Sequence, residues 1–305
     1  MENLELAVRA VKEAFPGMKL LEQEPMSAHS SFRIGGPADL LIDLPADAAG
    51  PLLALCKQEN IPHLFIGNGS NLLVGDKGIR GAVLRLQDDG ADPVLLDDGR
   101  LYAPAGMQLK RLCLFAREQR LTGLEFAFGI PGTVGGAVYM NAGAYGGEMV
   151  DVVESADCVS PDGQRYTLSA EELALSYRHS SLMDNGGIVL GVTLRLTPGD
   201  YDTIAATMKD LMGRRRDKQP LEYPSAGSFF KRPEGYFAGK LIQDAGLKGF
   251  AVGDAQISEK HAGFVINRGA ATAADMVELC RQVQTKIMET DGVLLEPEVR
   301  FIGEF

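Results

Sequence analysis

Apolar residues recur along the chain at spacings that predict its regular elements. Recurrence every three or four positions, the period of an amphipathic helix, predicts helices at 3–15, 47–59, 108–121, 201–217, 235–245 and 272–290. Alternating or continuous apolar runs predict strands at 38–44, 64–66, 82–86, 188–196 and 299–302. Asp97-Asp98-Gly99 and Asp162-Gly163 lie between extended runs and predict hairpin turns.

The order of these elements predicts an α+β protein. Helices and strands alternate at the start and hairpins follow, so we expect a mixed sheet. Composition changes after Pro198-Gly199-Asp200, where we place a domain boundary between 1–197 and 198–305. A chain of 305 residues is long enough for two such domains.

Two glycine-rich loops carry the strongest chemical signal. They are Gly67-Asn68-Gly69-Ser70-Asn71 and Gly129-Ile130-Pro131-Gly132-Thr133-Val134-Gly135-Gly136. Closely spaced backbone N–H groups with little side-chain bulk bind phosphate oxygens, so two such loops predict a cofactor with a diphosphate. The alternative is two tight turns in which glycine only permits a positive φ.

The first loop fits neither of the two common nucleotide motifs. A P-loop ends in Lys-Ser or Lys-Thr, whereas this loop ends in Asn71-Leu72. A Rossmann fingerprint needs a third glycine and a helix directly after it, but Gly75-Asp76-Lys77-Gly78 interrupts the chain too soon. We therefore expect no helix after Asn71.

Basic residues gather between Arg214 and Lys240 in a chain that is acidic overall. Lys218 and Lys231 flank a loop of small residues, Pro224 to Ser228, which places a hydroxyl beside cations and suits an anionic substrate. The triplet at 214–216 is better explained as a solvated helix face. No nucleophile elbow or Ser-His-Asp arrangement surrounds Ser228.

Two further polar groups have simple structural explanations from the sequence alone. Arg178, in Tyr177-Arg178-His179-Ser180-Ser181, could pair with an acid, and Glu298 with Arg300 could form a surface ion pair. The four histidines show no ligand spacing, so we expect no metal site.

Charge and cysteine usage exclude several classes of protein. A net charge of −11 argues against nucleic acid as a partner. Four cysteines without a CxxC pair predict buried free thiols: Cys56, Cys113, Cys158 and Cys280. The acidic N-terminus and the lack of an apolar run of membrane-spanning length predict a cytoplasmic protein without membrane insertion.

Six segments in order give the chain a resemblance to a known family. They are Ser30-Ser31-Phe32-Arg33-Ile34-Gly35-Gly36-Pro37-Ala38, Gly67 to Leu73, Gly129 to Ala137, Tyr177-Arg178, Ala226-Gly227-Ser228-Phe229-Phe230-Lys231 and Glu296-Pro297-Glu298-Val299-Arg300. Together they resemble the UDP-N-acetylenolpyruvoylglucosamine reductases, the MurB family of bacterial peptidoglycan synthesis. The resemblance runs from residue 29 to the C-terminus.

The resemblance implies a fold and a division of the chain. It implies an FAD-binding domain of the vanillyl-alcohol-oxidase (PCMH) type over 1–197, with subdomains at 1–85 and 86–197. A separate α+β substrate-binding domain occupies 198–305. No tyrosine-bearing insert stands between Arg178 and Ser228, so the chain resembles the shorter subtype, and Arg232 stands where some members have Asn.

The resemblance also assigns roles. The residues expected to hold FAD, noncovalently, are Gly67, Asn68, Gly69, Ser70, Asn71, Gly129, Pro131, Gly132, Thr133, Gly135 and Gly136. Arg178, Ser228 and Glu298 carry over as catalytic. Tyr177, Lys218 and Lys231 match positions near the substrate.

The implied reaction is reduction of UDP-N-acetylglucosamine enolpyruvate to UDP-N-acetylmuramate with NADPH. Arg178 and Glu298 are expected to stabilise charge on the substrate carboxylate, and Ser228 to supply a proton. Two alternatives stay open: a flavin oxidase or dehydrogenase built on the same FAD-binding half, and a flavin- or nucleotide-binding protein without turnover.

Overall fold

The computed structural model describes residues 2–305, with side chains from Val8 onward, and divides into two compact units. The first unit comprises the chain up to Glu22, Leu40–Asn68 and Gly81–Arg214. The second unit comprises Gln23–Asp39, Gly69–Arg80 and Arg215–Phe305. The assignment of FAD to 1–197 and substrate to 198–305 concerns function and stays a prediction.

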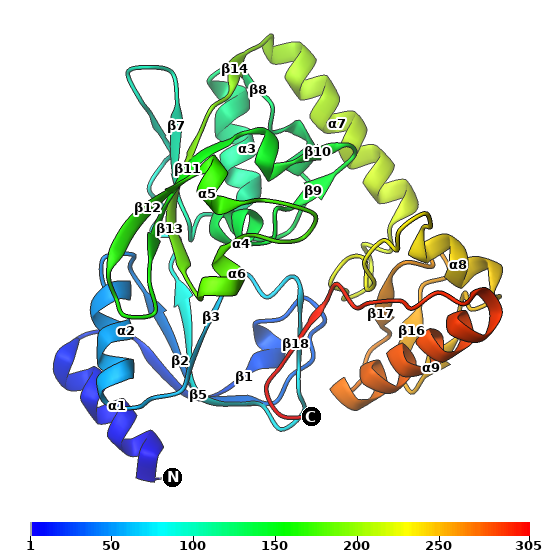
Figure 1. Ribbon diagram of the computed structural model, residues 1–305, viewed down its shortest axis with the longest axis horizontal. Coiled ribbons are helices and arrows are strands. Elements are labelled where there is room, and N and C mark those ends of the chain that lie inside the picture. The colour runs from blue at the N-terminus through cyan, green and yellow to red at the C-terminus, as the bar shows by residue number, and fades with distance from the viewer. Residues whose placement is uncertain (1) are drawn as a thin grey trace. The chain divides into compact units, whose positions relative to one another are not determined.

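An antiparallel sheet of five strands organises most of the first unit (Figure 1). Two helices pack near it: α3 begins after Gln108, and α4 lies against the central strand β13. Buried Leu101, Val192 and Leu194 contribute to the shared core. The elements are β6 (Val94–Leu95), β7 (Leu101–Pro104), β11 (Val153–Val159), β12 (Arg165–Ser169), β13 (Ile188–Leu194), α3 (Leu109–Glu118) and α4 (Val134–Tyr139), and the strand order is β12-β11-β13-β7-β6.

A second sheet has the strand order β1-β2-β5-β3, with β3 parallel to β5. Its alternating residues Leu40, Ile42 and Leu44 are buried together with Leu52 of α2, because alternate side chains of a strand share one face. Its elements and the two helices of this region are β1 (Leu20–Pro25), β2 (Pro37–Leu44), β3 (His63–Ile66), β5 (Ile79–Leu86), α1 (Glu2–Ala14) and α2 (Ala49–Gln58).

The second unit contains a three-stranded antiparallel sheet on which α9 packs, with α8 beside it (Figure 1). Phe229, Ile242 and Met276 lie in its core. The C-terminal strand β18 pairs in parallel with β4, the strand that follows the first glycine-rich loop. The elements are β4 (Leu72–Val74), β15 (Ala251–Val252), β16 (Ala255–Ile257), β17 (Val265–Asn267), β18 (Arg300–Ile302), α8 (Ala238–Asp244) and α9 (Ala273–Asp291).

The helix and strand predictions are confirmed, including α7 (Tyr201–Lys218) and both hairpin turns. The helix start at Thr272 carries the expected reciprocal cap, because Thr272 Oγ1 accepts from the Asp275 N–H at 3.1 Å and the Asp275 carboxylate accepts from the Thr272 N–H at 2.9 Å. A strand, β4, follows Asn71, as expected where no helix could form. The helix predicted to reach 121 ends at Glu118, because Arg120 adopts a left-handed φ of 57°.

Several short elements were not predicted from the sequence, although Ser169 and Glu172 form a capping box at the start of α5. They are β8 (Leu121–Thr122), β9 (Gly143–Ala144), β10 (Gly147–Glu148), β14 (Thr197–Pro198), α5 (Ala170–Leu173), α6 (Leu182–Asn185) and three 3-10 turns at Met26–Ala28, Glu125–Ala127 and Met149–Asp151. The four cysteines are free and buried, as predicted. Within residues 2–305 no helix has the length and apolar character to span a bilayer.

Candidate active site

In the first unit the two glycine-rich loops lie against each other. A Cβ atom added to Gly67 would stand 2.8 Å from Thr133 Oγ1, closer than real Cβ contacts allow. Gln108 Nε2 reaches Asn68 Oδ1 at 3.5 Å, which joins the first loop to the residue before α3. Glycine at position 67 therefore allows the two loops to approach each other this closely.

The second loop packs against residues 105–109, the turn that leads from β7 into α3, through main-chain hydrogen bonds. The N–H groups of Val134 and Gly135 donate to the carbonyls of Met107 and Ala105 at 2.8 and 2.9 Å, and the Leu109 N–H donates to Gly132 O at 2.9 Å. Thr133 then caps α4, which begins inside the loop, by accepting from the Gly136 N–H at 3.2 Å.

In the second unit the rest of the first loop packs on the segment that contains Ser31. The Ser31 N–H donates to Gly69 O at 3.1 Å, and a Cβ on Gly69 would overlap His29 O at 1.9 Å. Ser31 Oγ is buried and has no hydrogen-bond partner among residues 2–305. A buried hydroxyl without a partner is costly, so this oxygen suits a polar ligand held beside the loop. Both loops thus fit a phosphate-bearing cofactor.

Arg178 lies in a tight turn of the first unit. Ser176 and His179 exchange two main-chain hydrogen bonds of 3.1 Å, and Arg178 takes a left-handed φ of 55°. Its guanidinium donates to the carbonyls of Asn141 and Gly143 at 3.4 and 3.3 Å. The side chain is only 18% exposed, so its charge lies in a partly desolvated place where it acts more strongly than in water.

An acid and an aromatic ring accompany this arginine. Glu148 Oε1 lies 3.9 Å from Arg178 Nη1, and the guanidinium stands 5.1 Å from the Tyr177 ring centroid. The sequence suggested that Arg178 could pair with an acid; in the structure that acid is Glu148, at a separation near the upper limit for an ion pair.

Asn141 holds this turn in place, although it was not among the residues predicted from the sequence. It is fully buried and makes three hydrogen bonds. Its amide nitrogen donates to Glu148 Oε2 at 3.0 Å and to Ser176 O at 2.9 Å, while its amide oxygen accepts from the Val150 N–H at 2.9 Å. The detectable signal was an asparagine before a glycine-rich hairpin, a residue type that tolerates its left-handed φ of 41°.

Ser228 and Glu298 are brought to adjacent extended segments of the second unit. The Phe229 N–H donates to Gly263 O at 2.9 Å, and Phe229 O accepts from the Glu298 N–H at 2.8 Å. Asn71 Nδ2 donates to Glu298 O at 3.0 Å. Phe229 is buried, whereas Ser228 is exposed and Glu298 half-buried. The main chain therefore fixes both residues and leaves the serine hydroxyl accessible.

The predicted substrate-binding lysines lie near other charges. Lys231 Nζ stands 3.3 Å from Glu296 Oε2, at the same pairing of segments. Lys218 ends α7, and with Lys248 it adds to the effect of burial in lowering the pKa of His261. Arg232 stacks over the Phe237 ring at 4.3 Å. The second unit thus carries Ser228, Glu298 and both lysines, and the first carries Tyr177 and Arg178.

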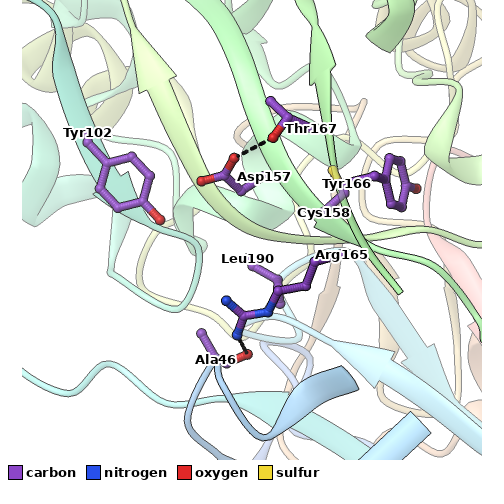
Figure 2. A pocket seen from close by; sticks show the side chains of 8 residues that line it. All are labelled: Ala46, Tyr102, Asp157, Cys158, Arg165, Tyr166, Thr167 and Leu190. Atoms are coloured by element: carbon purple, nitrogen blue, oxygen red, sulfur yellow. Dashed lines mark hydrogen bonds between the residues drawn. The ribbon is translucent and has the colours of Figure 1, made fainter. Parts of the chain in front are cut away.

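A cavity of about 330 Å³ opens elsewhere in the first unit, beside the five-stranded sheet (Figure 2). None of its eight lining residues is a predicted site residue. Its polar groups pair with their neighbours: Asp157 accepts from Thr167 Oγ1 at 2.9 Å, and Arg165 donates to Ala46 O at 3.1 Å. We place no part of the chemistry there. Across residues 2–305 no group of three or more metal-binding side chains comes together.

Two protein-family models match different parts of the chain. An FAD-binding domain model matches residues 47–169, and the model of the C-terminal domain of UDP-N-acetylenolpyruvoylglucosamine reductase matches residues 219–302. Gly67 and the second glycine-rich loop fall in the first match, and Ser228 and Glu298 in the second.

Curated relatives and a solved structure that match nearly the whole chain carry the same family name. A UDP-N-acetylenolpyruvoylglucosamine reductase of Agathobacter rectalis is 51% identical over 98% of each chain. One from Clostridium botulinum is 52% identical over 93% of each chain. The crystal structure of the reductase from Thermus caldophilus has 37% identity and a TM-score of 0.79, and covers 93% of this chain and 98% of that one.

Proposed function

We propose a residue-level mechanism for this chain, which belongs to the UDP-N-acetylenolpyruvoylglucosamine reductase family. The chain is an FAD-dependent oxidoreductase that reduces UDP-N-acetylglucosamine enolpyruvate to UDP-N-acetylmuramate with NADPH, a step of peptidoglycan synthesis. Hydride and a proton add across the enolpyruvyl double bond, and NADPH is oxidised to NADP⁺.

The two glycine-rich loops would hold FAD noncovalently, through Gly67 to Asn71 and Gly129 to Gly136. The close approach of the two loops at Gly67, the buried Ser31 hydroxyl and the start of α4 inside the second loop support this assignment. When bound, the flavin supplies hydride transfer, for which no side chain is suited. We assign FAD binding to 1–197 and substrate binding to 198–305.

Ser228 is the proton donor in this mechanism. Its hydroxyl is exposed while the flanking main chain is fixed by pairing with Gly263 and Glu298. A hydroxyl is a weak acid near neutral pH, but the carbon beside a developing enolate is a strong base, so transfer is favourable when the hydroxyl is well placed. This fixed, accessible serine is the observation that carries the proposal.

Arg178 and Glu298 stabilise the charge that develops on the substrate carboxylate. The guanidinium of Arg178 is preorganised by two carbonyl contacts in a partly desolvated place, so little reorganisation is needed as charge builds. Glu298, protonated or sharing a proton with that carboxylate, is held by the main-chain hydrogen bond from its N–H to Phe229 O. Tyr177, Lys218 and Lys231 bind other parts of the substrate, the lysines through its diphosphate.

The test is anaerobic addition of NADPH to the purified flavoprotein. We expect the flavin absorption band to bleach and to return when UDP-N-acetylglucosamine enolpyruvate is added. A flavin oxidase would regain its colour with oxygen but not with this substrate, and a binding protein without turnover would keep its colour throughout.

We further place the reaction in the cytoplasm, where NADPH and nucleotide sugars are formed.

Noncovalent attachment has a separate test. Neither glycine-rich loop contains a His or Cys that could form a covalent bond to the isoalloxazine ring. Acid or heat denaturation should therefore release all of the flavin into the supernatant. Yellow colour that stays with the precipitated protein would contradict this assignment.

A further inference from the structure

Within the first unit, the segment 105–109 contacts the second glycine-rich loop and Asn68, at the start of the first. It hydrogen-bonds to the second loop at three points, between Val134 and Met107, Gly135 and Ala105, and Leu109 and Gly132. Gln108 also forms an antiparallel bridge with Thr133, and its side chain reaches Asn68 of the first loop. The placement of Gln108 therefore sets the placement of both loops.

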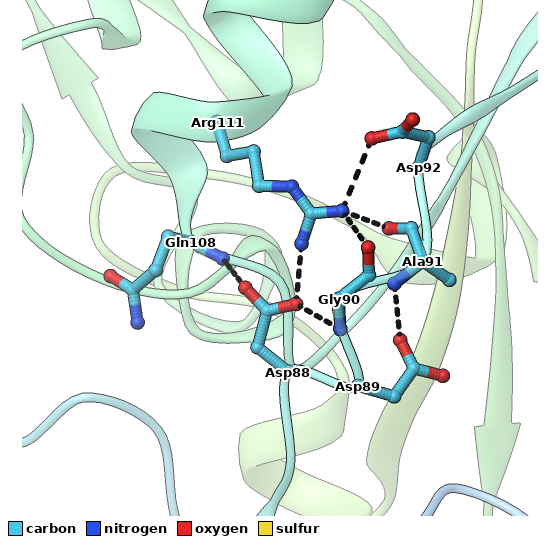
Figure 3. Close-up of polar contacts among 7 residues, drawn as sticks. All are labelled: Asp88, Asp89, Gly90, Ala91, Asp92, Gln108 and Arg111. Carbon is cyan, nitrogen blue, oxygen red and sulfur yellow. Dashed lines mark hydrogen bonds and ion pairs between the residues drawn. The ribbon is translucent and has the colours of Figure 1, made fainter.

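Gln108 is in turn fixed by a polar cluster that centres on Arg111 (Figure 3). Asp88 Oδ2 accepts from the Gln108 N–H at 3.4 Å, and Asp88 Oδ1 accepts from Arg111 Nη1 at 2.6 Å. Arg111 Nη2 also donates to Gly90 O at 2.5 Å, to Ala91 O, and to Asp92 Oδ1 at 3.2 Å. We call Asp88, Gly90, Ala91, Asp92 and Arg111 the Arg111 cluster.

The Arg111 cluster supplies a carboxylate to the start of α3, which has none of its own. The helix has no acidic residue in its first turn, and its first flanking residue, Gln108, makes no side-chain cap. Asp88 brings a carboxylate from another loop to the Gln108 N–H, where a negative charge interacts favourably with the helix dipole. Arg111, only 30% exposed, balances that charge and binds the two carbonyls that shape the acidic loop.

We propose that the Arg111 cluster is a positioning device for the flavin site. It holds Gln108, and through Gln108 the spacing of the two loops, although no residue of the cluster belongs to either loop. The inference rests on the proposed FAD-binding role of those loops. Arg111 and Asp88 are therefore positioning residues rather than catalytic ones.

The test compares Arg111→Ala with Arg117→Ala in the full-length holoenzyme. Arg117 lies on the same helix, is 25% exposed at its side chain, and pairs with Glu118 and the Tyr201 ring instead of the loop. We expect Arg111→Ala to weaken FAD binding by on the order of tenfold, the loss of a charged hydrogen bond in a partly exposed place. Arg117→Ala should leave FAD affinity unchanged, with similar thermal stability of the two apoproteins.

A second pair tests the carboxylate. Asp88→Ala should weaken FAD binding like Arg111→Ala, whereas Asp89→Ala should not, because Asp89 accepts only from the Ala91 N–H at 2.9 Å. Arg111→Lys, which keeps the charge, should recover part of the affinity. The position and fluorescence of the flavin band should change in the Arg111→Ala and Asp88→Ala holoenzymes alone.

Three outcomes are distinguishable. If Arg111→Ala and Asp88→Ala both keep the FAD affinity and the flavin spectrum of the wild type, the positioning role is overturned. The proposed function stays intact in that case, provided that the wild-type protein turns over substrate. A wild-type protein that binds no FAD would instead overturn the function of the loops. Equal loss of FAD affinity in Arg111→Ala and Arg117→Ala would reduce the cluster to general stabilisation of α3.

Discussion

The turn around Arg178 and the paired segments around Ser228 and Glu298 place functional side chains by different physical means. Arg178 depends on side chains: buried Asn141 makes three hydrogen bonds, and Arg178 itself adopts a left-handed φ. Ser228 and Glu298 depend on the main chain, because their neighbours exchange N–H and carbonyl groups across adjacent segments.

The difference determines how each region responds to substitution. A main-chain frame survives when a side chain on it changes, because the hydrogen bonds are made by the backbone. A frame of buried polar side chains loses its geometry when one member is removed, because the remaining groups stay buried without partners. Substitutions in the second unit should therefore affect chemistry, and those at Asn141 should affect both folding and chemistry.

The largest expected effect is that of Ser228→Ala. Overall turnover should fall at least by the roughly 10²–10⁴-fold usual for one general acid, while flavin reduction by NADPH stays near the wild-type rate. Stopped-flow measurement of the two half-reactions separates these rates. Equal slowing of both would mean that Ser228 supports the fold rather than donates a proton.

Glu298→Gln should come next, with substrate reduction lowered by about 10²-fold and FAD binding retained. Its amide keeps the size and hydrogen bonding of the carboxyl but removes the ionisable proton, and the main-chain bond to Phe229 persists. Glu296→Gln is the matched control, since Glu296 is exposed and pairs with Lys231 at the surface. Near-normal turnover of Glu298→Gln would leave Glu298 with a structural role.

Asn141→Ala should lower the free energy of unfolding by about 3 kcal/mol, because three hydrogen bonds are lost in a fully buried place. Urea unfolding measures this change. Asn185→Ala, which removes one part-buried hydrogen bond that an exposed side chain accepts from the Gly187 N–H, should cost about 1 kcal/mol. If the two variants are equally stable, the turn at Arg178 is not held by side chains.

The smallest effect concerns the cores that support both regions. Burial raises the pKa of Cys113 in the first unit and of Cys280 in the second to about 12, from an ordinary value of 9.0. The stability this confers is complete below pH 9 and is lost as pH rises towards 12, because the unfolded thiol ionises first. At pH 10 the loss should be about 1 kcal/mol per thiol.

Urea unfolding at pH 8 and pH 10 measures this loss. The variants Cys113→Ala and Cys280→Ala should each reduce the pH dependence of the free energy of unfolding by a similar amount. This result would show that the cores of the two units respond alike to pH, although the two units hold their functional side chains by different means. A Cys113→Ala protein with the full wild-type pH dependence would assign the alkaline loss to other groups.

Much of the fold followed from local patterns. Helix α9 was predicted from its apolar spacing and from the capping pair of Thr272 and Asp275, because caps and amphipathic faces are properties of neighbouring residues. The two glycine-rich loops stood out for the same reason, since close backbone approach needs glycine wherever the partner lies. Ser228 and Glu298 gained their assignment only from the resemblance, because a serine in a loop and a glutamate beside an arginine have ordinary explanations.

The sequence by itself determined the family, the cofactor and the longer helices and strands, because each depends on residue types at fixed spacing. Only the tertiary structure decided that Asn141 supports Arg178 and that Asp88 and Arg111 hold Gln108. The same is true of Ser31, whose buried hydroxyl beside the first loop has no partner in the described part of the chain. These contacts join residues that are distant along the chain. No local pattern encodes such a contact, because the energy of a hydrogen bond depends on where folding brings its two partners.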